Sequence, residues 1–122
     1  MHKYKIVIQY DGSFFRGWQL QKNQKTVQGD IENALMTIAR SKSRITVKGS
    51  CRTDAGVHAI GQVAHFELDT HLTENQLKNA LNFYTDENCK IMSLNKTYDR
   101  FDSRFDAKNR TYKYQIYFGK SI

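Results

Sequence analysis

Residues 45–68 read ITVKGSCRTDAGVHAIGQVAHFEL and decide the fold, because they hold two strand patterns separated by a polar loop. Ile45, Val47 and Gly49 alternate with polar residues and predict a strand that leads into the loop. Residues 62–68 (QVAHFEL) predict a second strand that leaves it. The loop thus joins two strands in the middle of the chain.

The sequence before this pair predicts one strand and one helix. In residues 4–10 (YKIVIQY), Tyr and Ile alternate with Lys, Val and Gln, which is the period of a strand. Residues 11–13 (DGS) end this strand as a turn. Residues 27–39 carry apolar side chains at helical spacing, and Thr26 stands where an N-cap is expected.

The sequence after the pair predicts a second helix and two further strands. Thr73 and Gln76 form a capping-box pattern ahead of helical spacing that runs to Tyr84. Residues 89–97 and 112–118 have strand patterns. The order is βαββαβ plus one strand, which predicts an α+β, ferredoxin-like antiparallel sheet with both helices on one face. A chain of 122 residues fits one such domain.

The net charge of +7 favours a polyanionic partner, although a solvated cationic surface is the alternative. The chain also has seven Tyr, seven Phe and one Trp, and aromatic faces can stack on nucleic-acid bases beside phosphate-binding cations. Most of these rings are nevertheless expected in the core. Nucleic acid is therefore the main specific candidate for a partner.

The cysteines and the hydropathy pattern argue against three other classes of protein. Cys51 and Cys89 form no CxxC pair, so neither a disulfide scaffold nor a zinc ribbon is expected. No apolar run approaches the roughly 18 residues of a membrane span, and the N-terminus lacks a signal-peptide pattern. These features predict a soluble, cytoplasmic protein.

The candidate catalytic residue is Asp54, within residues 50–59 (SCRTDAGVHA). A carboxylate can act as a nucleophile that forms and releases a covalent adduct. Aspartate is also common in turns, where its side chain bonds nearby backbone N–H groups. On the residues alone, the structural interpretation of Asp54 is favoured.

Three segments together resemble one family. Residues 50–59 closely resemble the signature loop of the TruA family of tRNA pseudouridine synthases, whose catalytic aspartate falls on Asp54. Residues 9–21 (QYDGSFFRGWQLQ) and 101–117 (FDSRFDAKNRTYKYQIY) resemble two further segments of that family. The resemblance runs over essentially the whole chain but covers only the family's first half. We therefore expect residues 1–122 to be the N-terminal domain, without the C-terminal domain.

The resemblance implies a chemistry and a substrate. Asp54 would attack a uridine at C6 of the base or at C1′ of the ribose, and both routes remain open. The N-glycosidic bond would break and the base would rejoin through C5, without a metal or an organic cofactor. The implied target is a uridine at about positions 38 to 40 in the anticodon stem-loop of tRNA. The resemblance also implies that the full-length protein is a homodimer.

Three further residues receive roles from the resemblance, and a fourth, Arg16, receives one from its charge. Arg52 would hold the Asp54 carboxylate ionised or contact a phosphate, and a solvated surface position is its alternative. Arg104 would be a basic residue near the active site or the RNA. Tyr112 would stack on the target base, with core burial as the competing interpretation. Arg16 would contact phosphates from the loop after the first strand.

Trp18 and His58 each have two interpretations. Trp18 lies in the same loop as Arg16, and its ring either stacks on RNA or packs inward. His58 either takes part in acid–base or metal chemistry, or forms a hydrogen bond that shapes the loop. Its spacing to His65 and Cys51 fits no standard zinc pattern, so the hydrogen-bonding role is favoured.

The sequence departs from the family pattern at two places, and it leaves two rival functions. Cys51 stands where Gly or Ser is expected, and residues 79–88 lack the usual proline. One rival is a ferredoxin-like RNA-binding module without catalysis, although the chain lacks an aromatic-rich RNP1-like strand. The other is an inactive paralogue that binds tRNA. For an enzyme, we expect little activity from residues 1–122 alone.

Overall fold

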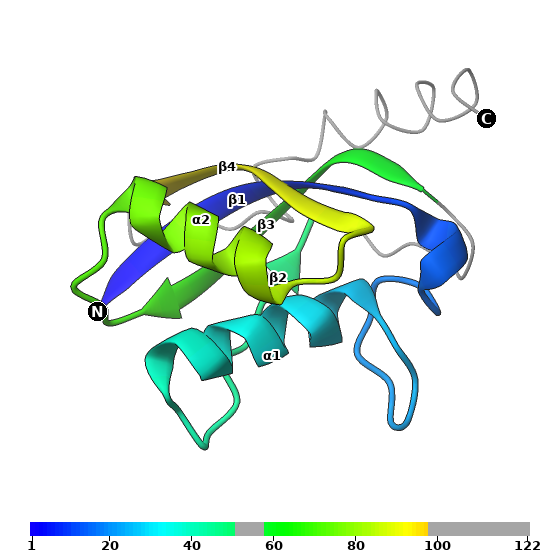
Figure 1. The fold of residues 1–122 in the computed structure, drawn as a ribbon, viewed down its shortest axis with the longest axis horizontal. Coiled ribbons are helices and arrows are strands. Elements are labelled where there is room, and N and C mark those ends of the chain that lie inside the picture. The colour runs from blue at the N-terminus through cyan, green and yellow to red at the C-terminus, as the bar shows by residue number, and fades with distance from the viewer. Residues whose placement is uncertain (51–57, 98–122) are drawn as a thin grey trace.

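The structure is a computed structural model that describes residues 1–50 and 58–97 (Figure 1). Its elements in chain order are β1 (His2–Tyr10), the short 3-10 turn η1 (Gly12–Phe14), α1 (Val27–Ala39), β2 (Lys48–Gly49), β3 (Ala59–Leu68), α2 (Glu74–Tyr84) and β4 (Cys89–Thr97). This order confirms the predicted βαββαβ arrangement. The strand predicted over residues 112–118 lies outside the described residues.

The four strands form one antiparallel sheet in the order β2-β3-β1-β4. β1 is central, and its residue Ile6 pairs with Ala64 of β3 on one side and with Leu94 of β4 on the other. Both helices cover the same face of this sheet (Figure 1). The structure therefore confirms the ferredoxin-like class.

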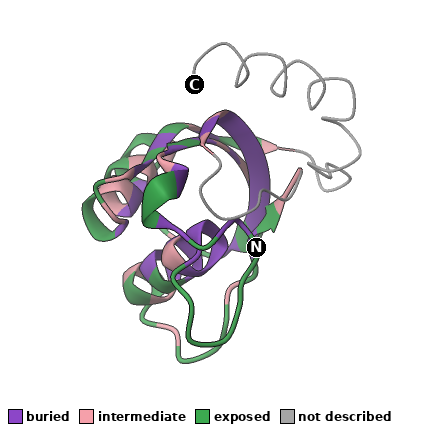
Figure 2. Cartoon of the chain, turned by 90° about the vertical axis from the view of Figure 1, so that its right-hand side faces the viewer, coloured by how far each residue is buried: buried purple, intermediate pink, exposed green. Residues whose placement is uncertain are grey.

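The hydrophobic core lies between the helices and the sheet, where Figure 2 shows most of the buried residues. Alternate side chains of β1 point into it, because successive residues of a strand face opposite sides. Burial of each large aliphatic side chain contributes about 1.5–3 kcal/mol. The central members of the core are Tyr4, Ile6, Ile8, Ile31, Leu35, Phe66, Leu77, Leu81 and Ile91.

Both helices begin at the residues that the sequence predicts. The Thr26 side chain accepts a hydrogen bond from the Gly29 N–H at the start of α1. Thr73 and Gln76 form the expected capping box at the start of α2. None of the helices in the described ranges is long and apolar enough to cross a bilayer.

Among the described residues, β4 is an edge strand of the sheet, and side chains of α2 bond its outer main-chain groups. The Asn82 amide donates to the Ile91 carbonyl (3.0 Å) and accepts the Ile91 N–H (2.8 Å). Near the other end of the strand, a Glu74 carboxylate oxygen accepts the Lys96 N–H at 2.8 Å. Exposed edge strands offer main-chain groups with which another chain can pair and aggregate. These hydrogen bonds from α2 occupy some of those groups on β4.

β2 is shorter than predicted, because Ile45 and Val47 lie before it rather than in it. The reason is a competition for hydrogen bonds. The Val47 N–H donates to Glu32 and its carbonyl accepts from Gln28, so side chains of α1 take the groups that a strand partner would need. β3, in contrast, is longer than predicted and begins at Ala59.

Candidate functional site

The predicted site residues are divided between described and undescribed parts of the chain. Asp54 and Arg52 lie in residues 51–57, and Arg104 and Tyr112 lie in residues 98–122, all outside the described residues. The described part of the candidate site therefore consists of the residues that flank residues 51–57. We call residues 51–57 the signature segment.

Ser50 precedes the signature segment and is held on β3 by two hydrogen bonds. Its N–H donates to the Val63 carbonyl at 2.7 Å. Its hydroxyl donates to the side-chain oxygen of Gln62 at 2.8 Å. Gln62 is only 2% exposed, so its side chain is fixed by the surrounding core. The residue directly before the signature segment is therefore anchored to the sheet.

His58 follows the signature segment and contacts the end of β1. Its Nδ1 lies 2.9 Å from the Gly12 nitrogen and 2.9 Å from Oδ1 of Asp11. The imidazole is partly exposed, whereas Gly12 is buried. The contact joins residues 46 positions apart in the chain. It therefore anchors the residue directly after the signature segment to the turn that follows β1.

Asp11 is held in place by the turn that it caps. Its Oδ1 accepts hydrogen bonds from the Ser13 hydroxyl (2.6 Å) and the Ser13 N–H (3.0 Å). These bonds, with a smaller contribution from His58, lower the pKa of the Asp11 carboxyl. Bonds to the ionised form favour that form. His58 therefore faces a carboxylate that stays ionised at neutral pH.

Trp18 packs inward, which was one of its two predicted alternatives. Its side chain is buried, with the residue 3% exposed, and its ring lies 6.4 Å from that of Tyr10 between centroids. The indole also contacts the backbone of Gly49 in β2. The structure thus disfavours an exposed Trp18 ring that stacks on RNA. It supports a role in positioning the strand before the signature segment.

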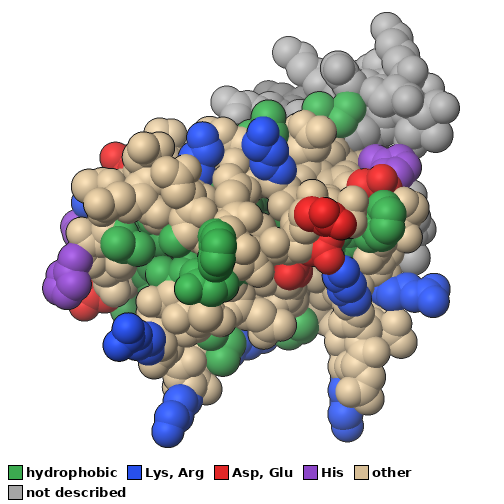
Figure 3. All heavy atoms as spheres, viewed as in Figure 1, with side chains coloured by type: hydrophobic (Ala, Val, Ile, Leu, Met, Phe, Trp, Pro, Cys, Tyr) green, Lys and Arg blue, Asp and Glu red, His purple; other side chains and the backbone are tan. Residues whose placement is uncertain are grey.

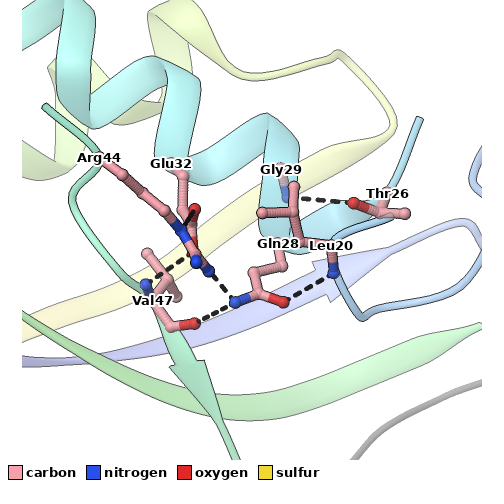
Figure 4. A network of polar contacts seen from close by, with 7 residues as sticks. All are labelled: Leu20, Thr26, Gln28, Gly29, Glu32, Arg44 and Val47. Atoms are coloured by element: carbon pink, nitrogen blue, oxygen red, sulfur yellow. Dashed lines mark hydrogen bonds and ion pairs between the residues drawn. The ribbon is translucent and has the colours of Figure 1, made fainter. Parts of the chain in front are cut away.

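A buried polar network joins α1 to the chain on both sides of it (Figure 4). The Gln28 side chain accepts the Leu20 N–H at 2.8 Å and donates to the Val47 carbonyl at 2.9 Å. It also donates to a Glu32 carboxylate oxygen at 3.0 Å. One glutamine therefore ties the loop after η1 to the residues that lead into β2.

Glu32 completes this network from the next turn of α1. Its carboxylate, 4% exposed, accepts from Arg44 Nε at 2.6 Å and from the Val47 N–H at 3.0 Å. The Glu32 hydrogen bond raises the pKa of Arg44. A buried carboxylate is stable only when its oxygens receive enough hydrogen bonds, and these donors supply them. The segment before β2 is therefore fixed by side chains of a helix.

The loop that follows η1 presents cations at the surface. Figure 3 shows Lys and Arg side chains on the loop that extends beside α1. Arg16 is exposed, and its N–H donates to the Lys25 carbonyl at 2.6 Å, which closes the base of the loop. Lys25 forms an ion pair with Asp86, and its ammonium lies 5.3 Å from the centre of the Phe15 ring. Arg16 is thus an exposed cation at the base of this loop.

Sequence reasoning missed the partners of His58 and of the network residues. The hydrogen-bonding interpretation of His58 agrees with the structure, but nothing local in the sequence points to Gly12 as its partner. The same is true of Gln28 and Val47, which are 19 residues apart.

Within residues 1–50 and 58–97, no three His, Cys, Asp or Glu side chains are arranged to hold a metal ion.

Comparisons with known proteins converge on one family. A family model described as tRNA pseudouridine synthase matches residues 6–106. The chain is 43% identical over 118 residues to "tRNA pseudouridine synthase A 2" of Bacillus cereus, covering 96% of this chain and 47% of that protein. It is 46% identical over 116 residues to "tRNA pseudouridine synthase A" of Ehrlichia chaffeensis, covering 93% of this chain and 46% of that protein. The chain thus spans about half the length of the curated relatives that it matches.

Proposed function

The chain belongs to the TruA family of tRNA pseudouridine synthases, and from that premise we propose that it carries the nucleophile of such an enzyme, Asp54. The observation that carries the proposal is the family match over residues 6–106, which includes the signature segment. The anchors at Ser50 and His58 support it, because a nucleophile needs a backbone held in a defined place. The activity belongs to the whole protein.

The proposed reaction isomerises a uridine without any net oxidation or reduction. The carboxylate of Asp54 attacks C6 of the base or C1′ of the ribose, and the bond between N1 and C1′ breaks. The base then rejoins the ribose through C5, the hydrogen on C5 leaves as a proton, and N1 takes up a proton, so the product is an isomer of the substrate. The adduct with the carboxylate is released, so the enzyme returns to its starting state.

The substrate class in this proposal is tRNA, with a target uridine near positions 38 to 40 of the anticodon stem-loop. The target nucleotide must leave the stack, because neither C1′ nor C6 is open to attack within a stacked helix. Tyr112 would stack on the flipped base, and Arg52, Arg104 and Arg16 would contact phosphates or the carboxylate. The net charge of +7 supports a polyanionic partner. The complete enzyme is proposed to be a cytoplasmic homodimer.

The test compares isomerisation by the complete gene product and by two aspartate variants. Tritium release from tRNA that contains 5-tritiated uridine reports the loss of hydrogen from C5. Asp54→Ala should abolish release, whereas Asp69→Ala, at an exposed position before α2, should leave it unchanged. Wild-type turnover by Asp54→Ala would exclude Asp54 as the nucleophile. Residues 1–122 alone are expected to release little tritium.

The alternative function is binding of tRNA without modification. It predicts that the wild-type protein binds tRNA with a steep dependence on salt but releases no tritium. Family membership disfavours this alternative, since the matched relatives carry names of synthases. The same tritium assay, performed beside a filter-binding measurement at several salt concentrations, separates the two functions.

A further inference from the structure

The signature segment is bounded by two anchors that belong to different elements. Ser50 is bonded to β3, and His58 contacts the turn that follows β1. We propose that His58 is a positioning residue, which fixes the chain directly after the signature segment by accepting the Gly12 N–H at Nδ1. The proposal rests on the proposed function, because it assigns His58 to the placement of Asp54.

The geometry permits only one of the two contacts of Nδ1 at a time. Nδ1 lies 2.9 Å from both the Gly12 nitrogen and Asp11 Oδ1. A ring nitrogen without a proton accepts from Gly12, whereas a ring nitrogen with a proton donates to Asp11. The protonation state of His58 therefore selects the partner.

Hydrogen-bond satisfaction favours Gly12 over Asp11 as the partner of Nδ1. Gly12 is buried, and a buried N–H without an acceptor costs about 1–3 kcal/mol. Asp11 Oδ1, in contrast, already accepts from the hydroxyl and the N–H of Ser13. The Gly12 N–H therefore depends on the His58 ring for its hydrogen bond, whereas Asp11 Oδ1 does not. In this state the proton of the imidazole resides on Nε2.

The position of His58 in the chain turns this bond into a constraint on the nucleophile. Asp54 lies four residues before His58, and Ala59, the next residue, is paired with Tyr10 in the sheet. A side-chain bond at His58 therefore adds a fixed contact one residue nearer to Asp54 in the chain than the first residue of β3. A misplacement of about 1 Å in an active site can lower a rate about a hundredfold. His58 can thus affect catalysis without touching the substrate.

Three substitutions at His58 separate positioning from acid–base catalysis. His58→Asn places an oxygen where Nδ1 stands, so it can still accept the Gly12 N–H but cannot be protonated. His58→Gln extends its amide toward the place of Nε2, and His58→Ala provides no acceptor. We expect kcat to fall about 10- to 100-fold in the Ala and Gln variants, with KM for tRNA changed by less than about threefold. Asn should restore most of kcat, because its side-chain oxygen can accept the Gly12 N–H.

An experiment without catalysis tests the same proposal in the complete gene product. Hydrogen exchange followed by mass spectrometry reports how firmly the signature segment is held. Exchange over residues 53–57 should accelerate in His58→Ala and return toward wild type in His58→Asn. His71→Ala, which removes an exposed histidine before α2, is the matched control and should change neither exchange nor kcat. The pattern of exchange stands even if the proposed function fails.

Two results would overturn the proposal. If Asn were as inactive as Ala, with unchanged exchange over residues 53–57 in both, His58 would act directly in proton transfer. If 15N NMR at pH 8 placed the proton on Nδ1, the bond from Gly12 would not exist. An inactive wild-type protein that still showed the expected exchange pattern would instead refute the proposed function alone.

Discussion

The indole of Trp18 lies against the backbone of Gly49, so closely that a methyl group on Gly49 would stand 2.6 Å from Cε2 of the ring. Glycine at this position therefore admits the largest side chain of the protein beneath a sheet edge. Gly49 belongs to β2 and precedes Ser50, the first anchor of the signature segment. Packing of Trp18 thus helps to fix the backbone of β2, which leads into the candidate site.

Gly49→Ala is expected to destabilise the fold by about 1–3 kcal/mol, because the added methyl group must displace the Trp18 ring or the strand. The free energy of unfolding from urea titration measures the effect. Trp18→Leu removes the indole ring, so Gly49→Ala should be nearly neutral in that background in a double-mutant cycle. Thr46→Ala, at an exposed position nearby, is the control and should change stability by less than about 0.5 kcal/mol. Equal effects of Gly49→Ala in both backgrounds would disprove the contact.

Glu32→Ala is expected to destabilise more than Arg44→Ala. Loss of the buried carboxylate leaves the Val47 N–H without its acceptor, at about 2–4 kcal/mol in total. Loss of Arg44 should cost less than about 2 kcal/mol, because its side chain is 50% exposed and water can replace part of the interaction. Urea titration orders the two variants, with exposed Glu87→Ala as the control. The reverse order would contradict the network as described.

Asp86→Asn should lower stability at neutral pH by about 0.2–1 kcal/mol, mainly through the ion pair with Lys25. The Lys25 interaction and the bonds from Asn88 lower the pKa of Asp86 below its ordinary value. The contribution is therefore complete above about pH 4, the unfolded value, and is lost as the pH falls through the lower folded value. Thermal melts from pH 7 to 2 should show the two proteins converging in acid. A difference that persisted at pH 2 would exclude this cause.

Cys89 should resist alkylation in the folded protein. Burial, with smaller contributions from Asp30 and Asp86, raises the pKa of its thiol, and the reactive form is the thiolate. A Cys51→Ser variant isolates the signal of Cys89. Iodoacetamide at pH 8 should label that variant only after urea is added. Rapid labelling of the native protein would show that the packing around β4 opens readily.

The fold could be predicted from the sequence because its signals are local. The alternation in residues 4–10 and the capping box at Thr73 each depend on neighbours within a few positions. The boundary of β2 could not be predicted in this way, since the side chain of Glu32 decides it from 15 residues away. Local periodicity predicts a strand at Val47, but hydrogen bonds from α1 take its main-chain groups.

In the candidate site, too, local patterns could be interpreted from the sequence, whereas contacts between distant residues could not. Asp54 was assigned from a motif, and it stays a prediction together with Arg52, Arg104 and Tyr112. For Trp18, sequence pattern left burial and exposure open, because an aromatic residue in a polar loop suits both. The partner of His58 depends on the meeting of two segments 46 residues apart, which one sequence does not reveal.

Gln28 also limits how this domain can be recombined. Its amide bonds Leu20 on one side and Val47 on the other, so a loop and a strand boundary share one side chain. A chimera that imports residues 12–26 from a relative with another residue at position 28 would inherit a loop shaped for that other residue. Such exchanges should succeed only when the loop, the first turns of α1 and residues 44–47 are transferred as one cassette.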